Sequence, residues 1–416
     1  MAYHRIVAAG YVYAFDTEKF SGTRHPELKS YRTAKECLPS QELFAFMHSI
    51  LINFGEEYLN MAELNGFEGV HRAYNREHGL EGDAYVFMRD FKIGLASVVV
   101  LITLQEKELS AESIIGLQAG GSWQIEGMDI DGYIAALMDS IKKRVKYSEK
   151  YVTVFLKENE RVDDRELYGL IELDPGYEGA SLGTVHKTVS KDASMIDGIR
   201  LFYSRDSMVL FFYDDPVKRF TEITNLKITD YAAQIEGRFQ SCGHAGSPVS
   251  PIVPVFLDYL VEIEPLRLQH LMLSAYGVRM KAGGKSKDEM AKLKEDATLM
   301  LDFYHVISAS MYRGVKEAMK IGQENMGIND LKIIFDEKMN LTAESIEMKH
   351  QLVLEKWNRL FTYTLAAVGF ASVMAEFLLA YLKLEGPAGT ALILVSSTLL
   401  FIFIVWVILS MVLKRK

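Results

Sequence analysis

The sequence has 416 residues and little cysteine or proline, with two cysteines and nine prolines. Cys37 and Cys242 cannot form the disulfide framework of a small secreted protein, and they are typical of a reducing compartment. Residues 1–5 lead into a short mixed run that predicts a strand, which excludes a signal peptide there. There is no repeat of fixed period and no low-complexity tract. We therefore expect the chain before its C-terminal apolar runs to lie in the cytosol.

The sequence also lacks the motifs of common enzyme classes. Gly284-Lys285-Ser286 is not a phosphate-binding loop, because Arg279 stands where that motif needs a glycine. Cys242 and His244 have no partner pair at zinc-site spacing, and the sequence has no nucleophile elbow or dinucleotide fingerprint. The net charge of −9 argues against direct nucleic-acid binding. We therefore predict a protein that is not an enzyme.

Two long apolar runs stand out at the C-terminus. Residues 360–382 and 388–413 each exceed the roughly 20 residues that a helix needs to cross a bilayer core. They predict transmembrane helices over 357–383 and 388–413. Basic residues precede the first run and follow the second, whereas the short loop between the runs has almost none. Both termini are therefore expected to be cytoplasmic, and the protein is expected to lie in the cell's inner membrane.

The first run carries one acidic residue, Glu376, well inside its end. Intramembrane carboxylates usually face a bundle interior or water. Spacing by threes and fours from Glu376 defines a mostly small or polar stripe on one helix face. It consists of Asn358, Thr362, Leu365, Gly369, Ser372 and Glu376. We predict that this stripe lines a pore between several copies of the chain; the alternative is a small-residue seam for helix packing, with Glu376 protonated or bonded to a neighbouring helix.

Before these runs, the pattern predicts two α/β units and a helical region. The N-terminal unit is expected over 1–195, the second over 196–253, and a long helical stalk region over 254–356. The second unit opens with a hairpin pattern, because two β-rich runs flank Ser204–Ser207. The strands expected in the first unit are 5–15, 85–88, 95–104, 151–156 and 167–173, and the helices are 40–65 and 129–147. The stalk should run unbroken from about residue 330 into the first span.

Two groups of charged residues are candidate binding sites. The acid pairs Asp163–Asp164 and Asp214–Asp215 follow predicted strands, where carboxylates could hold magnesium, although adjacent acids in turns are more often simply solvated. A basic run at the end of a predicted helix could hold a phosphate-bearing ligand. It consists of Lys142, Lys143, Arg144 and Lys146. The alternative is a solvated helix end, where these charges oppose the helix dipole favourably.

This layout resembles the CorA family of metal-ion transporters over about residues 196–416. Residues 208–215 and 251–261 are similar to that family's strand and helix start. The resemblance implies a homopentamer whose first spans line a central pore and whose cytosolic funnel gates it. One departure is clear, because residues 380–386 read Ala-Tyr-Leu-Lys-Leu-Glu-Gly where the family has its Gly-Met-Asn signature, and this puts magnesium selectivity in doubt.

The expected fold is thus an α/β cytosolic domain followed by long stalk helices and two C-terminal transmembrane helices. The leading function is a CorA-like homo-oligomeric ion channel or transporter, gated by a ligand on its cytosolic domain. One alternative is a membrane effector of a type III CRISPR antiviral system, activated by a nucleotide second messenger. Another is a non-conducting, membrane-anchored scaffold. The expected partners are the lipid bilayer, further copies of the chain and a small ion or nucleotide; the candidate bound groups are a divalent cation such as magnesium or a nucleotide.

Overall fold

A computed structural model describes most of the chain as two compact units, Met1–Lys338 and Met339–Lys416. The described residues are 3–17, 29–31, 41–91, 93–120, 123–140, 144–158, 162–194, 198–213, 252–280 and 313–382, with isolated positions between 295 and 402. Each unit is described by itself below.

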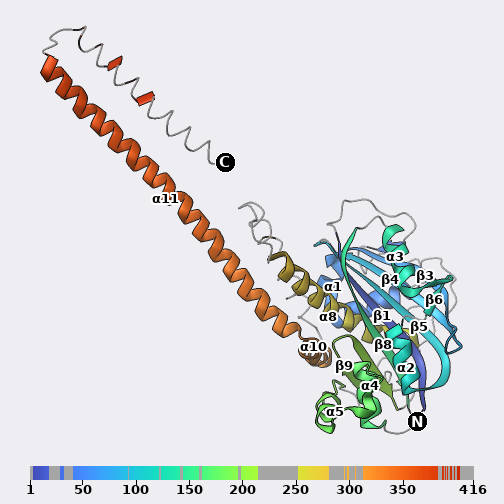
Figure 1. Ribbon diagram of the computed structural model, residues 1–416. Coiled ribbons are helices and arrows are strands. Elements are labelled where there is room, and N and C mark those ends of the chain that lie inside the picture. The colour runs from blue at the N-terminus through green and yellow to red at the C-terminus, as the bar shows by residue number, and fades with distance from the viewer. Residues whose placement is uncertain are drawn as a thin grey trace. The chain divides into compact units, whose positions relative to one another are not determined.

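The first unit contains one ten-stranded sheet (Figure 1). Its strands are β1 (Tyr3–Thr17), β2 (Lys29–Tyr31), β3 (Ala62–Asn75), β4 (Leu80–Phe91), β5 (Leu95–Ser110), β6 (Trp123–Ile125), β7 (Met128–Asp129), β8 (Val145–Lys157), β9 (Ile199–Tyr203) and β10 (Ser207–Phe212). Their order is β7-β6-β3-β4-β5-β1-β8-β10-β9, with β2 paired to β3. All these pairs are antiparallel except β8 with β10. The N-terminal strand therefore lies in the middle of the sheet.

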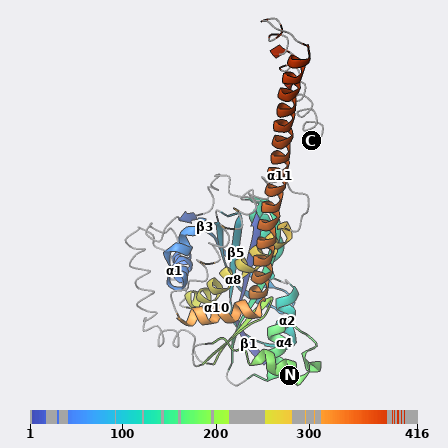
Figure 2. The same ribbon diagram turned by 90° about the vertical axis from the view of Figure 1, so that its left-hand side faces the viewer.

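Helices cover both faces of this sheet. They are α1 (Gln41–Met61), α2 (Ala111–Gly120), α3 (Ile130–Ser140), α4 (Asp164–Glu172), the 3₁₀ turn η1 (Tyr177–Gly179), α5 (Leu182–Val189), α8 (Ile252–Met280) and α10 (Arg313–Asn325). Residues of α2 to α5 share one hydrophobic core with alternate residues of β1, β4, β5 and β8. Figure 2 shows α1, α8 and α10 in front of the sheet, on the opposite face. The sheet is thus buried on both sides, and the first residues of β5 form a continuous apolar run accordingly.

The sheet curls toward the α2–α5 face. Three strands separate β6 from β1 in the strand order. Nevertheless, the Tyr13 hydroxyl on β1 donates to Asp131, which lies in the first turn of α3 just after β7, over 2.6 Å. A strongly twisted sheet allows this approach, because twist accumulates from strand to strand. The α2–α5 side is therefore the concave face.

On the other face, α8 packs closely on β1. A β-carbon placed on Gly10 would lie 2.5 Å from the Leu260 side chain of α8, so a larger residue there would have to displace that leucine. Gly322 of α10 lets α10 approach α8 in the same way, because a β-carbon there would lie 2.6 Å from Leu266. Sheet, α8 and α10 therefore form a closely packed stack.

Several sequence-based predictions are confirmed. The expected strands 5–15, 85–88, 95–104 and 151–156 correspond to β1, β4, β5 and β8, and the hairpin corresponds to β9 and β10. Residues 167–173 were wrongly expected as a strand, because they lie largely in α4. Helix 129–147 is shorter than expected, since α3 ends at Ser140 and β8 begins at Val145. Strands from both sides of the expected boundary at 195 share one sheet.

The helix expected from residue 330 is present as α11 (Ile328–Leu382), a single helix of 55 residues. Among the described residues, however, no helix has the length and apolar character that a membrane crossing requires. This finding overturns the predicted two-span, CorA-like membrane architecture, the membrane-channel reading and the inner-membrane location. The prediction relied on run length and interpreted Thr362, Ser372 and Glu376 as pore lining, although such polar groups also lower the apolar character of a helix. Most of residues 388–413 lie outside the described part.

Candidate functional site

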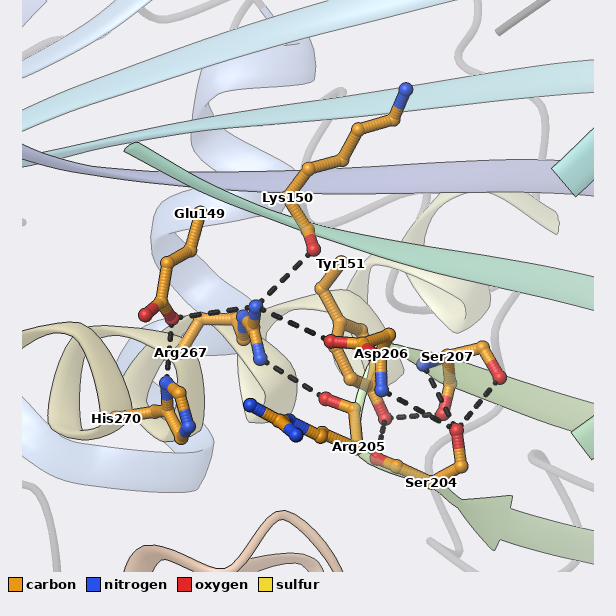
Figure 3. A network of polar contacts seen from close by, with 9 residues as sticks. All are labelled: Glu149, Lys150, Tyr151, Ser204, Arg205, Asp206, Ser207, Arg267 and His270. Carbon is orange, nitrogen blue, oxygen red and sulfur yellow. Dashed lines mark hydrogen bonds and ion pairs between the residues drawn. The ribbon is translucent and has the colours of Figure 1, made fainter. Parts of the chain in front are cut away.

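A polar network joins α8, β8 and the β9–β10 turn around Arg267 (Figure 3). The Arg267 side chain is almost completely buried. Its Nη2 donates to the Lys150 carbonyl over 3.3 Å and lies 3.3 Å from the Glu149 carboxylate. Its Nη1 donates to the Arg205 carbonyl over 3.1 Å, and the Asp206 carboxylate lies 3.9 Å from Nη2. One guanidinium therefore ties a helix, a strand and a turn together.

The turn itself is held by hydroxyl groups. Ser204 Oγ accepts from the backbone N–H of Ser207 over 3.2 Å, and the Ser204 N–H donates to the Ser207 carbonyl. The hydroxyl of buried Tyr151 donates to the carbonyls of both serines. The Arg267 guanidinium also lies 5.3 Å from the Tyr151 ring centre, within cation–π range. Tyr151 of β8 thus holds the turn through its hydroxyl and contacts Arg267 of α8 through its ring.

Glu149 balances the positive charge of this network. Its carboxylate accepts from His270 Nδ1 over 2.7 Å as well as facing Arg267. Buried carboxylates are costly unless paired and hydrogen-bonded, and Glu149 has both kinds of partner. His270 lies one helical turn after Arg267 on α8, so both side chains point to the same strand. The site is therefore a buried, charge-balanced cluster that a change in α8 would disturb.

The network continues toward the start of α11. Tyr203 precedes the β9–β10 turn, and its carbonyl accepts from Asn325 Nδ2 over 3.1 Å. Asn325 ends α10, and its Oδ1 accepts from Lys191 over 2.8 Å. Gly327 then adopts a left-handed φ of 71°, which glycine allows, and α11 begins at the next residue. A short path of hydrogen bonds therefore links the turn to the corner from which α11 starts.

An acidic residue of α8, Glu262, contacts the end of β9. Glu262 is buried and accepts from the Tyr203 hydroxyl over 3.2 Å. Burial, with a smaller contribution from the nearby Asp258 charge, raises the pKa of Glu262 to about 8, although the Tyr203 hydrogen bond opposes this shift. Tyr203 consequently contacts α8 through its side chain and α10 through its carbonyl.

A separate cluster lies at the β3–β6 edge of the sheet, around His71. His71 Nε2 contacts Glu68, and Nδ1 lies 2.8 Å from Glu126 in the β6–β7 turn. Tyr133 of α3 donates to Glu68 over 2.5 Å. Because both ring nitrogens face carboxylates, the charged imidazolium suits this position best. The hydrogen bond with Glu68, opposed by burial, raises the pKa of His71.

This cluster predicts a stabilisation that depends on pH. Because the folded pKa of His71 is raised, its contribution is fully present below the unfolded value near 6.5 and is lost as pH rises through the folded pKa. We expect His71→Gln to lower the free energy of unfolding by about 1–2 kcal/mol near pH 6 and by less at alkaline pH. Urea titrations of both proteins across this range measure the difference. A difference independent of pH would contradict the prediction.

The residues singled out in the sequence do not gather in one place. Asp163 caps α4, accepting from the N–H groups of Arg165 and Glu166, so its carboxylate has a structural role. Asp164 begins the same helix, and Arg144 and Lys146 are exposed near the start of β8. Asp214, Asp215, Lys142 and Lys143 lie outside the described residues. Within the described part, no three His, Cys, Asp or Glu side chains are grouped to hold a metal ion.

The proposed pore stripe lies along α11 and its residues are exposed. Two of its hydroxyls bond to their own helix, since Thr362 donates to the Asn358 carbonyl and Ser372 to the Val368 carbonyl. The predicted pore role of Leu365, Gly369, Glu376 and the other members required a membrane span, and no described helix provides one.

Comparison with known proteins gave no match. The chain matches no protein-family model, no curated protein and no solved structure. The resemblance to CorA therefore stays a prediction.

Sequence reasoning missed the Arg267 network. Glu149 and His270 stand 121 residues apart, and neither belongs to a motif. One signal was present: Glu264, Arg267 and His270 interrupt a largely apolar helix pattern at three-residue spacings on α8. Charged residues inside such a pattern point to buried partners.

Proposed function

We propose that this chain is a ligand-sensing homo-oligomer without enzymatic activity. In this proposal the sheet-containing unit is the sensor and α11 is the element through which copies assemble. The single observation that carries it is the apolar surface along α11. Ligand control and homo-oligomerisation are the same as predicted from the sequence; the predicted membrane spans are not part of this proposal.

The apolar surface of α11 follows a seven-residue spacing. Ile334, Leu341 and Met348 stand seven residues apart, and Leu352 continues the same stripe. Their side chains are between 45% and 64% exposed. Monomeric proteins seldom expose contiguous large apolar surface, and a seven-residue apolar spacing is typical of helices that pack around one another. Further copies of α11 would cover this stripe.

Polar residues within the stripe support a defined assembly. Lys338 and Ser345 lie on the same helix face as the apolar stripe. Each stands four residues after one apolar member and three residues before the next. Farther along, Arg359 donates to Glu355 over 2.5 Å on the same helix. Polar residues in such a seam specify register and copy number at some cost in stability. The expected pentamer stays a prediction.

The sensing role is supported by the path from the sheet to α11. Arg267 holds the β9–β10 turn, and the Tyr203 carbonyl next to that turn accepts from Asn325. Asn325 is the last residue of α10, and α11 begins shortly after it. Ile328 and Phe335 at the start of α11 are buried in the first unit. A shift of α8 would therefore act on the first turns of α11 through packed side chains and hydrogen bonds.

The assembly is tested with a double variant, Leu341→Glu with Met348→Glu. Burying each of these side chains contributes about 1.5–3 kcal/mol, so their loss from two contacting helices should weaken association at least about 100-fold. Light scattering and sedimentation equilibrium of the full chain measure the mass. The matched control is Ala343→Glu with His350→Glu, which adds the same charges about 200° around the helix. A monomeric wild type, or equal weakening by both variants, would refute the proposal.

A further inference from the structure

The two-residue turn between β6 and β7 has an unfavourable backbone conformation at Glu126. Glu126 adopts a φ of 52°, and in the described part of the chain only Leu173 is also a non-glycine residue with positive φ. Gly127 follows with a φ of 80°, so both central residues of the turn are left-handed. Such turns usually carry asparagine and glycine, because a β-carbon makes this conformation costly. Side-chain contacts must therefore hold Glu126 in place.

His71 of β3 supplies such a contact. Its Nδ1 lies 2.8 Å from the Glu126 carboxylate, and its Nε2 contacts Glu68. Glu68 and His71 are three residues apart, which in a regular strand would place them on opposite faces. The register of β3 shifts between Phe67 and Gly69, and this bulge turns Glu68 toward the His71 side. The imidazole therefore stands between two carboxylates from different elements.

The titratable groups that face His71 within the described residues are two carboxylates and one phenol. Glu68 comes from β3, Glu126 from the turn, and Tyr133 from α3. The Tyr133 hydroxyl donates to Glu68 over 2.5 Å and lies 3.1 Å from His71 Nε2. The His71 side chain is 14% exposed, so protons from solvent can reach it.

Loss of one proton from His71 leaves too few donors for this cluster. The imidazolium has two N–H groups, one for each carboxylate, whereas the neutral ring has only one. Glu68 keeps the Tyr133 hydroxyl as a donor, so Glu126 is the carboxylate that loses its partner. Because the Glu126 side chain is 56% exposed, water can replace the ring as its partner. The left-handed backbone of the turn is then no longer held by the histidine.

Helix α3 begins directly after this turn and leads to the Arg267 network. Asp129 of β7 accepts from the Gly132 N–H in the first turn of α3 over 2.8 Å. Asp131, in the same first turn, accepts from Lys150 Nζ over 3.1 Å. The backbone carbonyl of Lys150 accepts from Arg267 on the opposite face of the sheet. A displaced turn would therefore move Asp131 and act on a partner of Arg267.

We propose that His71 is a proton-operated latch on the β6–β7 turn and the start of α3. The imidazolium holds the turn closed, and loss of its proton frees Glu126 and lets the strained turn relax. The hydrogen bond with Glu68 raises the pKa of His71, so the latch is closed below the unfolded value near 6.5 and opens as pH rises through the higher folded pKa. The proposal rests on the proposed sensor role and makes the proton its signal.

The test is hydrogen exchange of the full chain at residues 126–133, expressed as protection factors so that the direct effect of pH on exchange cancels. We expect protection to fall about tenfold between about pH 6 and about pH 9, the equivalent of one charge-assisted hydrogen bond, and by a smaller factor at residues 204–207. His71→Lys keeps its charge in this range and should stay protected at both pH values. His71→Gln should be poorly protected at both.

Two further variants separate the latch from other effects of pH. Glu262 titrates in the same range, so each protein is compared with the wild type at the same pH. His186→Gln is the matched control, because His186 is exposed on α5, and it should behave as the wild type does. Glu126→Gly removes the carboxylate and places glycine where left-handed backbone is required. This protein should stay protected at both pH values, and it leaves β3 unaltered.

Three results would overturn the proposal: wild-type protection that does not depend on pH, an equal fall in the His71→Lys protein, or an equal fall in the Glu126→Gly protein. A turn that opens while residues 204–207 keep their protection would overturn the link to Arg267. The experiment is repeated on the Leu341→Glu, Met348→Glu protein. A response that persists without assembly separates the latch from the oligomer, so the failure of one is not the failure of the other.

Discussion

Replacing Arg89 by leucine should lower the free energy of unfolding by about 3–5 kcal/mol. Arg89 of β4 and Glu264 of α8 are both 0% exposed, and Arg89 Nη1 lies 2.7 Å from the carboxylate. Glu264 also accepts from Ser97 and Tyr58. Removing the guanidinium leaves a carboxylate that is desolvated and has only neutral donors. Urea denaturation at neutral pH measures the loss.

The control for Arg89 is the double variant Arg89→Leu with Glu264→Leu. A buried ion pair replaced as a whole by apolar residues costs far less than a pair that has lost one member. The double variant should therefore recover most of the stability that the single variant loses. If both proteins unfold at the same urea concentration, the main contribution of Arg89 lies in its bonds to Asn65 and the Tyr58 carbonyl.

Replacing Arg267 by leucine should lower the free energy of unfolding by about 3 kcal/mol. The change removes donors from the Lys150 and Arg205 carbonyls and leaves Glu149 with His270 alone. Because His270 still donates to that carboxylate, the loss should be smaller than for Arg89. Hydrogen exchange should also become faster at the amides of residues 204–207, which the turn protects.

Arg200→Leu is the matched control for Arg267. Arg200 pairs with Asp192 over 3.1 Å, but this pair is partly exposed, so its removal should cost less than about 1 kcal/mol. Unchanged exchange in the β9–β10 turn of the Arg267→Leu protein would show that the serine and tyrosine hydroxyls hold the turn without the guanidinium. That result would also remove the first step of the proposed path to α11.

Local patterns in the sequence predicted the strands of this fold better than its helix boundaries. Alternating or continuous apolar residues mark β1, β5 and the β9–β10 hairpin clearly. The error at α4 arose because residues 167–173 are rich in apolar residues while Asp163 and Asp164 were considered as metal ligands. The same two acids are a helix-start signal, since one caps α4 and the other lies in its first turn.

The candidate sites could not be predicted, because their members meet only through the sheet. Glu149, Ser204 and Arg267 come from a strand, a turn and a helix that lie far apart in the chain. Strand order decides these contacts, and the parallel pairing of β8 with β10 has no local signature. The proposed assembly surface on α11 is different, because the spacing of Ile334, Leu341 and Met348 is visible in the sequence itself.

The central place of β1 bears on how the protein is made. β1 leaves the ribosome before its partners β5 and β8, whose residues 95–110 and 145–157 emerge much later. Until then its apolar side chains have no sheet to join, and long-range pairings of this kind form slowly. The nascent chain must therefore keep β1 from aggregating until β8 has been translated, nearly halfway through this unit, and chaperone binding would protect it most during that period.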